Sequence, residues 1–126
     1  MLIEKPLKPE EVLEQIAEIA EFCKCWYDKT NVQEMSERLT NLNVNLAKSA
    51  DLLVRAQEIY HNGIAVETEK LLNSDISPSV LNNLVKGRVA TYNKLYTLCE
   101  RVNKTITHQI EAIRTQISLQ KALTNI

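Results

Sequence analysis

The stretch RVATYNKLYTLCERVNKTITHQIEAIRTQI, residues 88–117, decides the fold class of this chain. Its apolar side chains recur at spacings of three and four residues over about eight helical turns, the pattern of an amphipathic helix with one buried side. These side chains are Tyr92, Leu95, Leu98, Cys99, Val102, Ile106, Ile110, Ile113 and Ile117. The pattern predicts a long final helix that begins at Arg88.

A second long helix is expected before it, starting after the polar run 28–31. Thr30 or Asn31 is its expected N-cap, with Gln33 or Glu34 closing a capping box. The segment covers about 30 residues, or roughly 45 Å at the helical rise. We expect its buried side to consist of Met35, Leu39, Leu42, Leu46, Ala50, Leu53 and Tyr60. Gly63 either ends this helix or only bends it.

Two shorter helices complete the pattern. The first is expected to start near Pro9 and to bury Val12, Ile16, Ile19, Ala20, Cys23 and Trp26. The clearest loop is 73–79, where Ser77 suits an N-cap and Pro78 a first helical position. The short helix that follows either stops at Gly87 or passes through it.

The composition supports an all-α chain. In 126 residues there are only 2 Gly and 3 Pro, 44% of residues are hydrophobic and 5% are aromatic. These values exclude collagen-like, disulfide-framework and β-sandwich proteins. We therefore predict a single helical domain, residues 1–126, folded as an elongated antiparallel bundle of three to four helices with long second and last helices.

The chain is expected to be cytoplasmic and without a membrane span, because no apolar run is long enough to cross a bilayer and no secretory signal opens the sequence. Its three cysteines are an odd number, which does not suit a disulfide framework. On a helix, Cys23 and Cys25 point in different directions and cannot share a metal ion. We expect small buried hydrophobes in a reducing compartment.

No catalytic motif is present. The chain has no phosphate-binding glycine loop, no zinc-protease helix motif and no nucleophile elbow. Cys99 falls on the apolar side of its helix, where a thiol is inert. His108 and Glu111 form a lone His-x-x-Glu pair on the polar side, for which a helix-surface hydrogen bond is the expected role. We predict no enzyme, no metal and no cofactor.

The polar side of the last helix is the best candidate for binding. Lys94, Arg101 and His108 are seven residues apart and so nearly stacked, and Lys104 shares their sector. Arg and His beside Lys suit phosphate recognition, so we predict an anion site of Arg101, Lys104, His108 and Lys94, with Arg88 extending it. The alternative is an ordinary solvated face of mixed charge.

Charge is unevenly distributed along the chain. Residues 1–86 hold nine Lys and Arg against 14 Asp and Glu, whereas residues 87–126 hold six against two. Such asymmetry marks a surface for an anionic partner. It is equally explained if the basic last helix packs beside the acidic first one.

The segment from Arg101 to Lys121, with the core THQIEAIRTQIS at 107–118, resembles the C-terminal helix of small all-helical accessory proteins of tailed bacteriophages and prophages. Many of these are encoded among recombination or host-defence-evasion genes. The resemblance implies a virus-encoded accessory protein in the host cytoplasm. It implies nothing about mechanism.

Three function classes follow from these observations. The first is a non-enzymatic homo-oligomer, a dimer or dimer of dimers, that captures a small phosphate-containing ligand such as a nucleotide signal of host defence. The second is a phage recombination or replication accessory that contacts nucleic acid or a recombinase. The third is a structural helical adaptor. Few aromatics and a net charge of −1 disfavour nucleic acid, so we favour the first.

Overall fold

The computed structural model describes residues 6–125, which form four helices and no strand. They are α1 (Pro9–Lys24), α2 (Val32–Leu71), α3 (Pro78–Arg88) and α4 (Ala90–Thr124). The predicted all-α bundle with long second and last helices is confirmed. α2 has 40 residues and α4 has 35, so each extends for more than about 50 Å.

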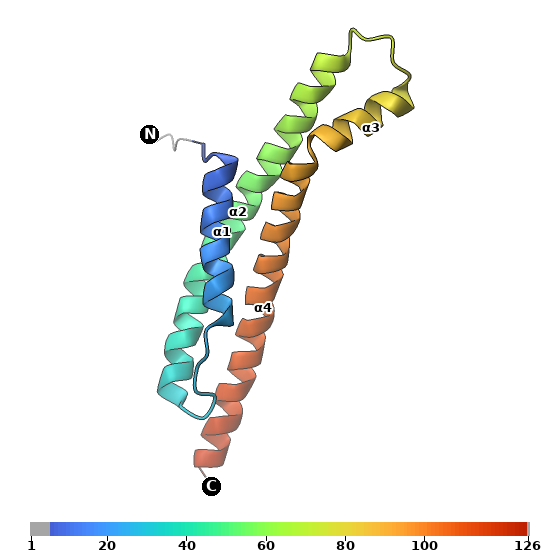
Figure 1. Ribbon diagram of the computed structural model, residues 1–126. Helices are drawn as coiled ribbons and strands as arrows, with labels where there is room; N and C mark the ends of the chain where they lie inside the picture. The colour runs from blue at the N-terminus through green and yellow to red at the C-terminus, as the bar shows by residue number, and fades with distance from the viewer. Residues whose placement is uncertain (1–5, 126) are drawn as a thin grey trace, which may run out of the picture.

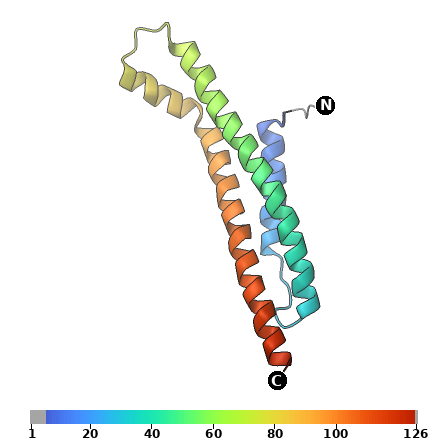
Figure 2. The same cartoon turned by 180° about the vertical axis from the view of Figure 1, so that it is seen from behind.

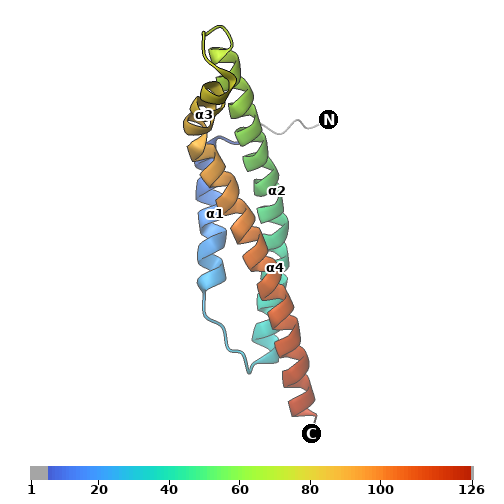
Figure 3. The ribbon, with the colours of Figure 1, turned by 90° about the vertical axis from the view of Figure 1, so that its right-hand side faces the viewer.

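The frame of the molecule is an antiparallel hairpin of α2 and α4 (Figure 1). α1 lies along one half of this hairpin, contacts both long helices and runs parallel to α4 (Figures 1 and 2). Past the N-terminal end of α1, α3 bends away from the long axis of the bundle (Figure 1). The side view in Figure 3 shows how narrow the bundle is. Within residues 6–125, no helix is both long and apolar enough to cross a membrane.

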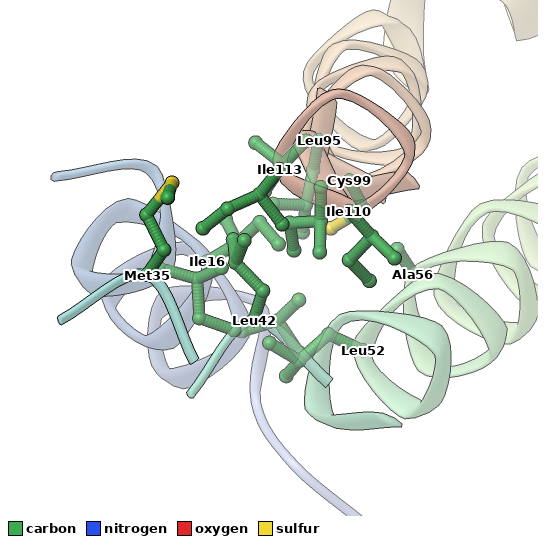
Figure 4. Packing of buried hydrophobic residues seen from close by; sticks show 13 residues of the cluster. Ile16, Met35, Leu42, Leu52, Ala56, Leu95, Cys99, Ile110 and Ile113 are labelled. Carbon is green, nitrogen blue, oxygen red and sulfur yellow. The ribbon is translucent and has the colours of Figure 1, made fainter. Parts of the chain in front are cut away.

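One hydrophobic cluster joins α1, α2 and α4. Figure 4 shows Ile16 of α1, Leu42 and Leu52 of α2, and Ile110 and Ile113 of α4 directed toward one another. On α4 the buried residues follow the predicted stripe from Leu95 to Ile113. The aliphatic stripes of the three helices therefore face a common interior, as a three-helix contact requires.

Two residues predicted to be buried are exposed. α1 ends at Lys24 and the chain continues extended, so Trp26 leaves the helical stripe and its side chain is 83% exposed. On α2 the buried side runs through Ser49 rather than Ala50, which is exposed. Ser49 faces α4, where its hydroxyl accepts a hydrogen bond from the Asn103 amide at 2.9 Å.

The predicted starts of α1, α2 and α3 are confirmed, whereas the last helix begins at Ala90 and not at Arg88, which is the last residue of α3. The Asn31 side chain caps α2 by accepting a hydrogen bond from the Glu34 N–H at 3.0 Å. The Glu34 carboxylate accepts from the Asp28 N–H instead of closing the predicted capping box on Asn31. Ser77 caps α3 through the Val80 N–H, and Pro78 is the first residue of that helix.

The sequence left open whether helices end at Gly63 and at Gly87. Both glycines lie inside helices. α2 passes through Gly63 without a left-handed residue. A Cβ at Gly63 would lie 2.8 Å from the Tyr92 ring, so this glycine permits close approach of α2 and α4. α3 also passes through Gly87, and the break before α4 falls at the buried Val89.

Candidate functional site

The five predicted binding residues lie on two helices. Lys94, Arg101, Lys104 and His108 are all on α4 and exposed, whereas Arg88 is the last residue of α3. Because α3 bends away from the axis of α4, the structure does not present the five as one continuous row (Figure 1).

Lys94 and Arg101 do come together. They line one shallow depression of about 290 Å³ on the outer side of α4, together with Asn93, Thr97 and Leu98. No carboxylate is among these lining residues. Within residues 6–125, neither cation has an ion-pair partner. The depression therefore offers two uncompensated positive charges beside an amide and a hydroxyl.

Lys104 and Arg88 are engaged elsewhere. The Lys104 ammonium lies 3.4 Å from the Glu100 carboxylate one turn earlier on α4. The Arg88 guanidinium donates to Glu67 of α2 at 3.1 Å, and Lys70 contacts the same carboxylate at 3.1 Å. Hydrogen bonds from Lys70 and Arg88 lower the pKa of Glu67. Arg88 thus attaches the end of α3 to α2 instead of extending an anion site.

His108 is more loosely held. Its Nδ1 is 4.0 Å from the Glu111 carboxylate, and both side chains are largely exposed. This separation is too long for the hydrogen bond predicted from the sequence. In the described part of the chain, no group of three or more His, Cys, Asp or Glu side chains could hold a metal ion. His108 remains available one heptad below Arg101.

An apolar groove adjoins the depression. It has a volume of about 260 Å³ and lies between α1 and α4, lined by Pro9, Glu10, Leu13, Thr91, Tyr92, Lys94, Leu95 and Leu98. It shares Lys94 and Leu98 with the depression, so the two hollows are adjacent. Leu13 is 50% exposed on the α1 side of this groove. Sequence analysis missed the groove, because it depends on how α1 aligns with α4.

A buried arginine was also missed. Arg38 of α2 is only 6% exposed, and its guanidinium lies 4.1 Å from the centre of the Phe22 ring and 5.2 Å from that of Tyr27. It donates to the Cys23 carbonyl at 3.3 Å and to the Gln109 side chain at 3.4 Å. Arg38 falls midway between Met35 and Leu42 on the buried side of α2, and this spacing was the signal that could have identified it.

The cysteines do not provide a nucleophile near the depression. Burial raises the pKa of Cys99 to about 11. Burial also raises the pKa of Cys23, although the Arg38 charge opposes the change. Both thiols are therefore protonated at neutral pH.

No protein-family model matches this chain, and neither the curated proteins nor the solved structures contain a match. The case for a function therefore rests on the residues and geometry described above.

Proposed function

We propose that this chain is a non-enzymatic helical binding protein that captures a small phosphate-bearing anion at Lys94 and Arg101. One observation carries the proposal. The two cations share a depression with Asn93 and Thr97 and with no carboxylate, and neither is neutralised by another described residue. A phosphate placed there would meet donors of four kinds.

The four donors have distinct roles. The Arg101 guanidinium provides a planar fork for two phosphate oxygens. The Lys94 ammonium, seven residues earlier on the same side of the helix, acts as a point charge. The Asn93 amide and the Thr97 hydroxyl line the same depression on the same helix. His108, a further heptad along, suits a second phosphate group when protonated. A diphosphate or nucleotide matches this row better than an isolated phosphate.

The proposal includes the setting that the sequence resemblance implies. The protein acts in the cytoplasm of a phage-infected cell as a homo-oligomer and withdraws a nucleotide signal from host defence. Support for oligomerisation comes from exposed apolar side chains such as Leu13 and Trp26, which a single copy leaves in water.

Calorimetric titration tests the site. Pyrophosphate, ATP and a cyclic dinucleotide are titrated into the wild-type chain, Arg101→Ala and the control Arg114→Ala. Arg114 is also exposed on α4 but does not line the depression. We expect Arg101→Ala to raise Kd about tenfold or more, the value of a charge-assisted hydrogen bond, and Arg114→Ala to leave it unchanged.

Two results would overturn the proposal. One is the absence of binding by wild-type protein to all three phosphate compounds. The other is equal loss of affinity in Arg101→Ala and Arg114→Ala, which would indicate nonspecific attraction to a basic helix. Either result favours the structural adaptor.

A further inference from the structure

The groove between α1 and α4 has walls of opposite charge. On its α1 side lies Glu10, which has no ion-pair partner among the described residues. On its α4 side lies Lys94, and Arg101 lies one heptad further along α4 in the adjoining depression; neither has an ion-pair partner among residues 6–125. The floor between them is apolar, and Leu13 is half exposed there.

The two charged walls cover the same part of the bundle. α1 and α4 run parallel (Figure 1), and Glu10 and Lys94 line the same groove at its upper end. Lower down, the Gln109 side chain donates to the Cys23 carbonyl at 3.0 Å. Glu10 of α1 is therefore level, within about a turn, with Lys94 of α4.

The apolar floor continues downward along α4. Leu98, Thr105, Ala112 and Leu119 are spaced by seven residues and so lie in one row on that helix. The facing side of α1 carries Leu13, Ala17 and Ala20. Most of these side chains are small, which lets another helix approach closely, and Leu119 at the lower end is 59% exposed.

We propose that a second copy of this chain docks on the α1/α4 groove, related to the first by a two-fold axis parallel to the long axis of the bundle. Rotation about such an axis brings α1 of one copy opposite α4 of the other and leaves each residue at the same level along the bundle. It therefore places Glu10 of each copy against the side of the other copy that carries Lys94 and Arg101, with Leu13 and Leu98 in the shared centre. A two-fold axis perpendicular to the bundle would instead place α1 against α1 and α4 against α4, so that like charges would face each other.

The proposed dimer contact and the proposed anion site use the same cations, Lys94 and Arg101. If the proposed function is right, a phosphate compound competes with the carboxylates of the second copy for Lys94 and Arg101. Pyrophosphate should then weaken the dimer. This consequence rests on the proposed function, whereas the dimer itself does not.

A charge exchange tests the dimer. Sedimentation velocity at micromolar concentration and about 50 mM salt should give the wild-type chain twice its 14.4 kDa mass. Glu10→Lys alone and Lys94→Glu alone should each raise the dimer Kd about tenfold or more, since each reversal acts at two symmetric contacts. The double variant Glu10→Lys/Lys94→Glu should restore the dimer.

The apolar floor is tested with a matched pair of variants. Leu13→Asp should give a monomer, whereas Val54→Asp, at a position on α2 that is 52% exposed against 50% for Leu13, should remain a dimer. Circular dichroism checks that both variants keep the helicity of the wild type. A monomeric wild type, failure of the double variant to restore the dimer, or equal effects of Leu13→Asp and Val54→Asp would overturn the proposal.

The same variants separate this inference from the proposed function. A neutral counterpart, Leu13→Asn, introduces no carboxylate beside Lys94, so it should bind pyrophosphate at least as tightly as wild type. A wild-type dimer that binds no pyrophosphate would refute the anion site and retain the interface. A wild-type monomer that binds pyrophosphate would refute the interface and retain the anion site.

Discussion

Arg38 is a buried cation whose charge is balanced by dipoles and aromatic rings. Its hydrogen bonds go to the Cys23 carbonyl at the end of α1 and to Gln109, while the Phe22 and Tyr27 rings cover the guanidinium. The C-terminal end of a helix carries partial negative charge, which favours a cation there. Its Nε has no hydrogen-bond partner among residues 6–125. Arg38 thus ties three helices together at a cost in desolvation.

This balance predicts different outcomes for two substitutions of Arg38. Arg38→Ala should lower the free energy of unfolding by about 2–4 kcal/mol, since it opens a cavity and removes the cation–π contact. Arg38→Met should cost less than about half as much, because an apolar side chain fills the space and no charge is desolvated. Urea denaturation followed by circular dichroism measures both. Equal losses would show that the charge itself stabilises the fold.

The pKa of Cys99 gives a prediction for pH. Because burial raises this pKa from an ordinary value of 9.0 to about 11 in the folded chain, folding favours the protonated thiol. The stability it contributes is complete below about pH 9 and is lost as pH rises toward 11. In native protein at pH 8, iodoacetamide should label the exposed Cys25 well before Cys99, as followed by mass spectrometry of peptides. Equal labelling rates would contradict the burial of Cys99.

At the scale of the helices, the sequence predicted the apolar stripes of α1 and α4 better than that of α2. α4 has no polar residue among its buried positions, so apolar spacing alone identifies its inner side. α2 buries Arg38 and Ser49, and its exposed Ala50 fits the apolar pattern as well as a buried residue would. Ser49 is inside because Asn103 of α4 satisfies its hydroxyl. That partner is 54 residues away and depends on helix register.

The two helical glycines predict opposite responses to alanine. Nothing lies within 4 Å of a Cβ at Gly87, so Gly87→Ala should raise the free energy of unfolding by about 0.5–1 kcal/mol through helix propensity. At Gly63 the new Cβ would meet the half-buried Tyr92 ring, and Val89 lies at 3.4 Å, so Gly63→Ala should not be stabilising. Thermal unfolding of both variants compares them directly. A stabilising Gly63→Ala would mean that Tyr92 moves freely.

At the scale of the molecule, the fold was predictable and the site only in part. Helix spacing indicates which side of each helix is buried, so an elongated bundle follows from the sequence. The sequence also placed Lys94 and Arg101 on one side of α4, as the shared depression confirms. It could not predict that Arg88 pairs with Glu67, 21 residues earlier, or that Glu10 lies across a groove from Lys94. Those neighbours depend on how helices align in three dimensions.

The arrangement of charge over the whole surface predicts weak binding to nucleic acid. Proteins that bind single-stranded DNA without sequence preference combine a long basic groove with several stacking aromatics. Here two cations without an ion-pair partner among residues 6–125 share one depression, Glu10 lies across the groove from Lys94, and the net charge is −1. Trp26 is the one aromatic among the exposed large hydrophobic side chains of residues 6–125.

We therefore expect a Kd above about 10 µM for a thymidine oligonucleotide at about 150 mM salt, measured by fluorescence anisotropy. With about two phosphates neutralised, the slope of log K against log salt should be near −1.4, far shallower than for an extended basic groove. Arg101→Ala should reduce that slope by about half, whereas Arg114→Ala should leave it unchanged. A submicromolar Kd with a steep slope would instead support the recombination or replication accessory, because it would require many more phosphate contacts than the depression on α4 provides.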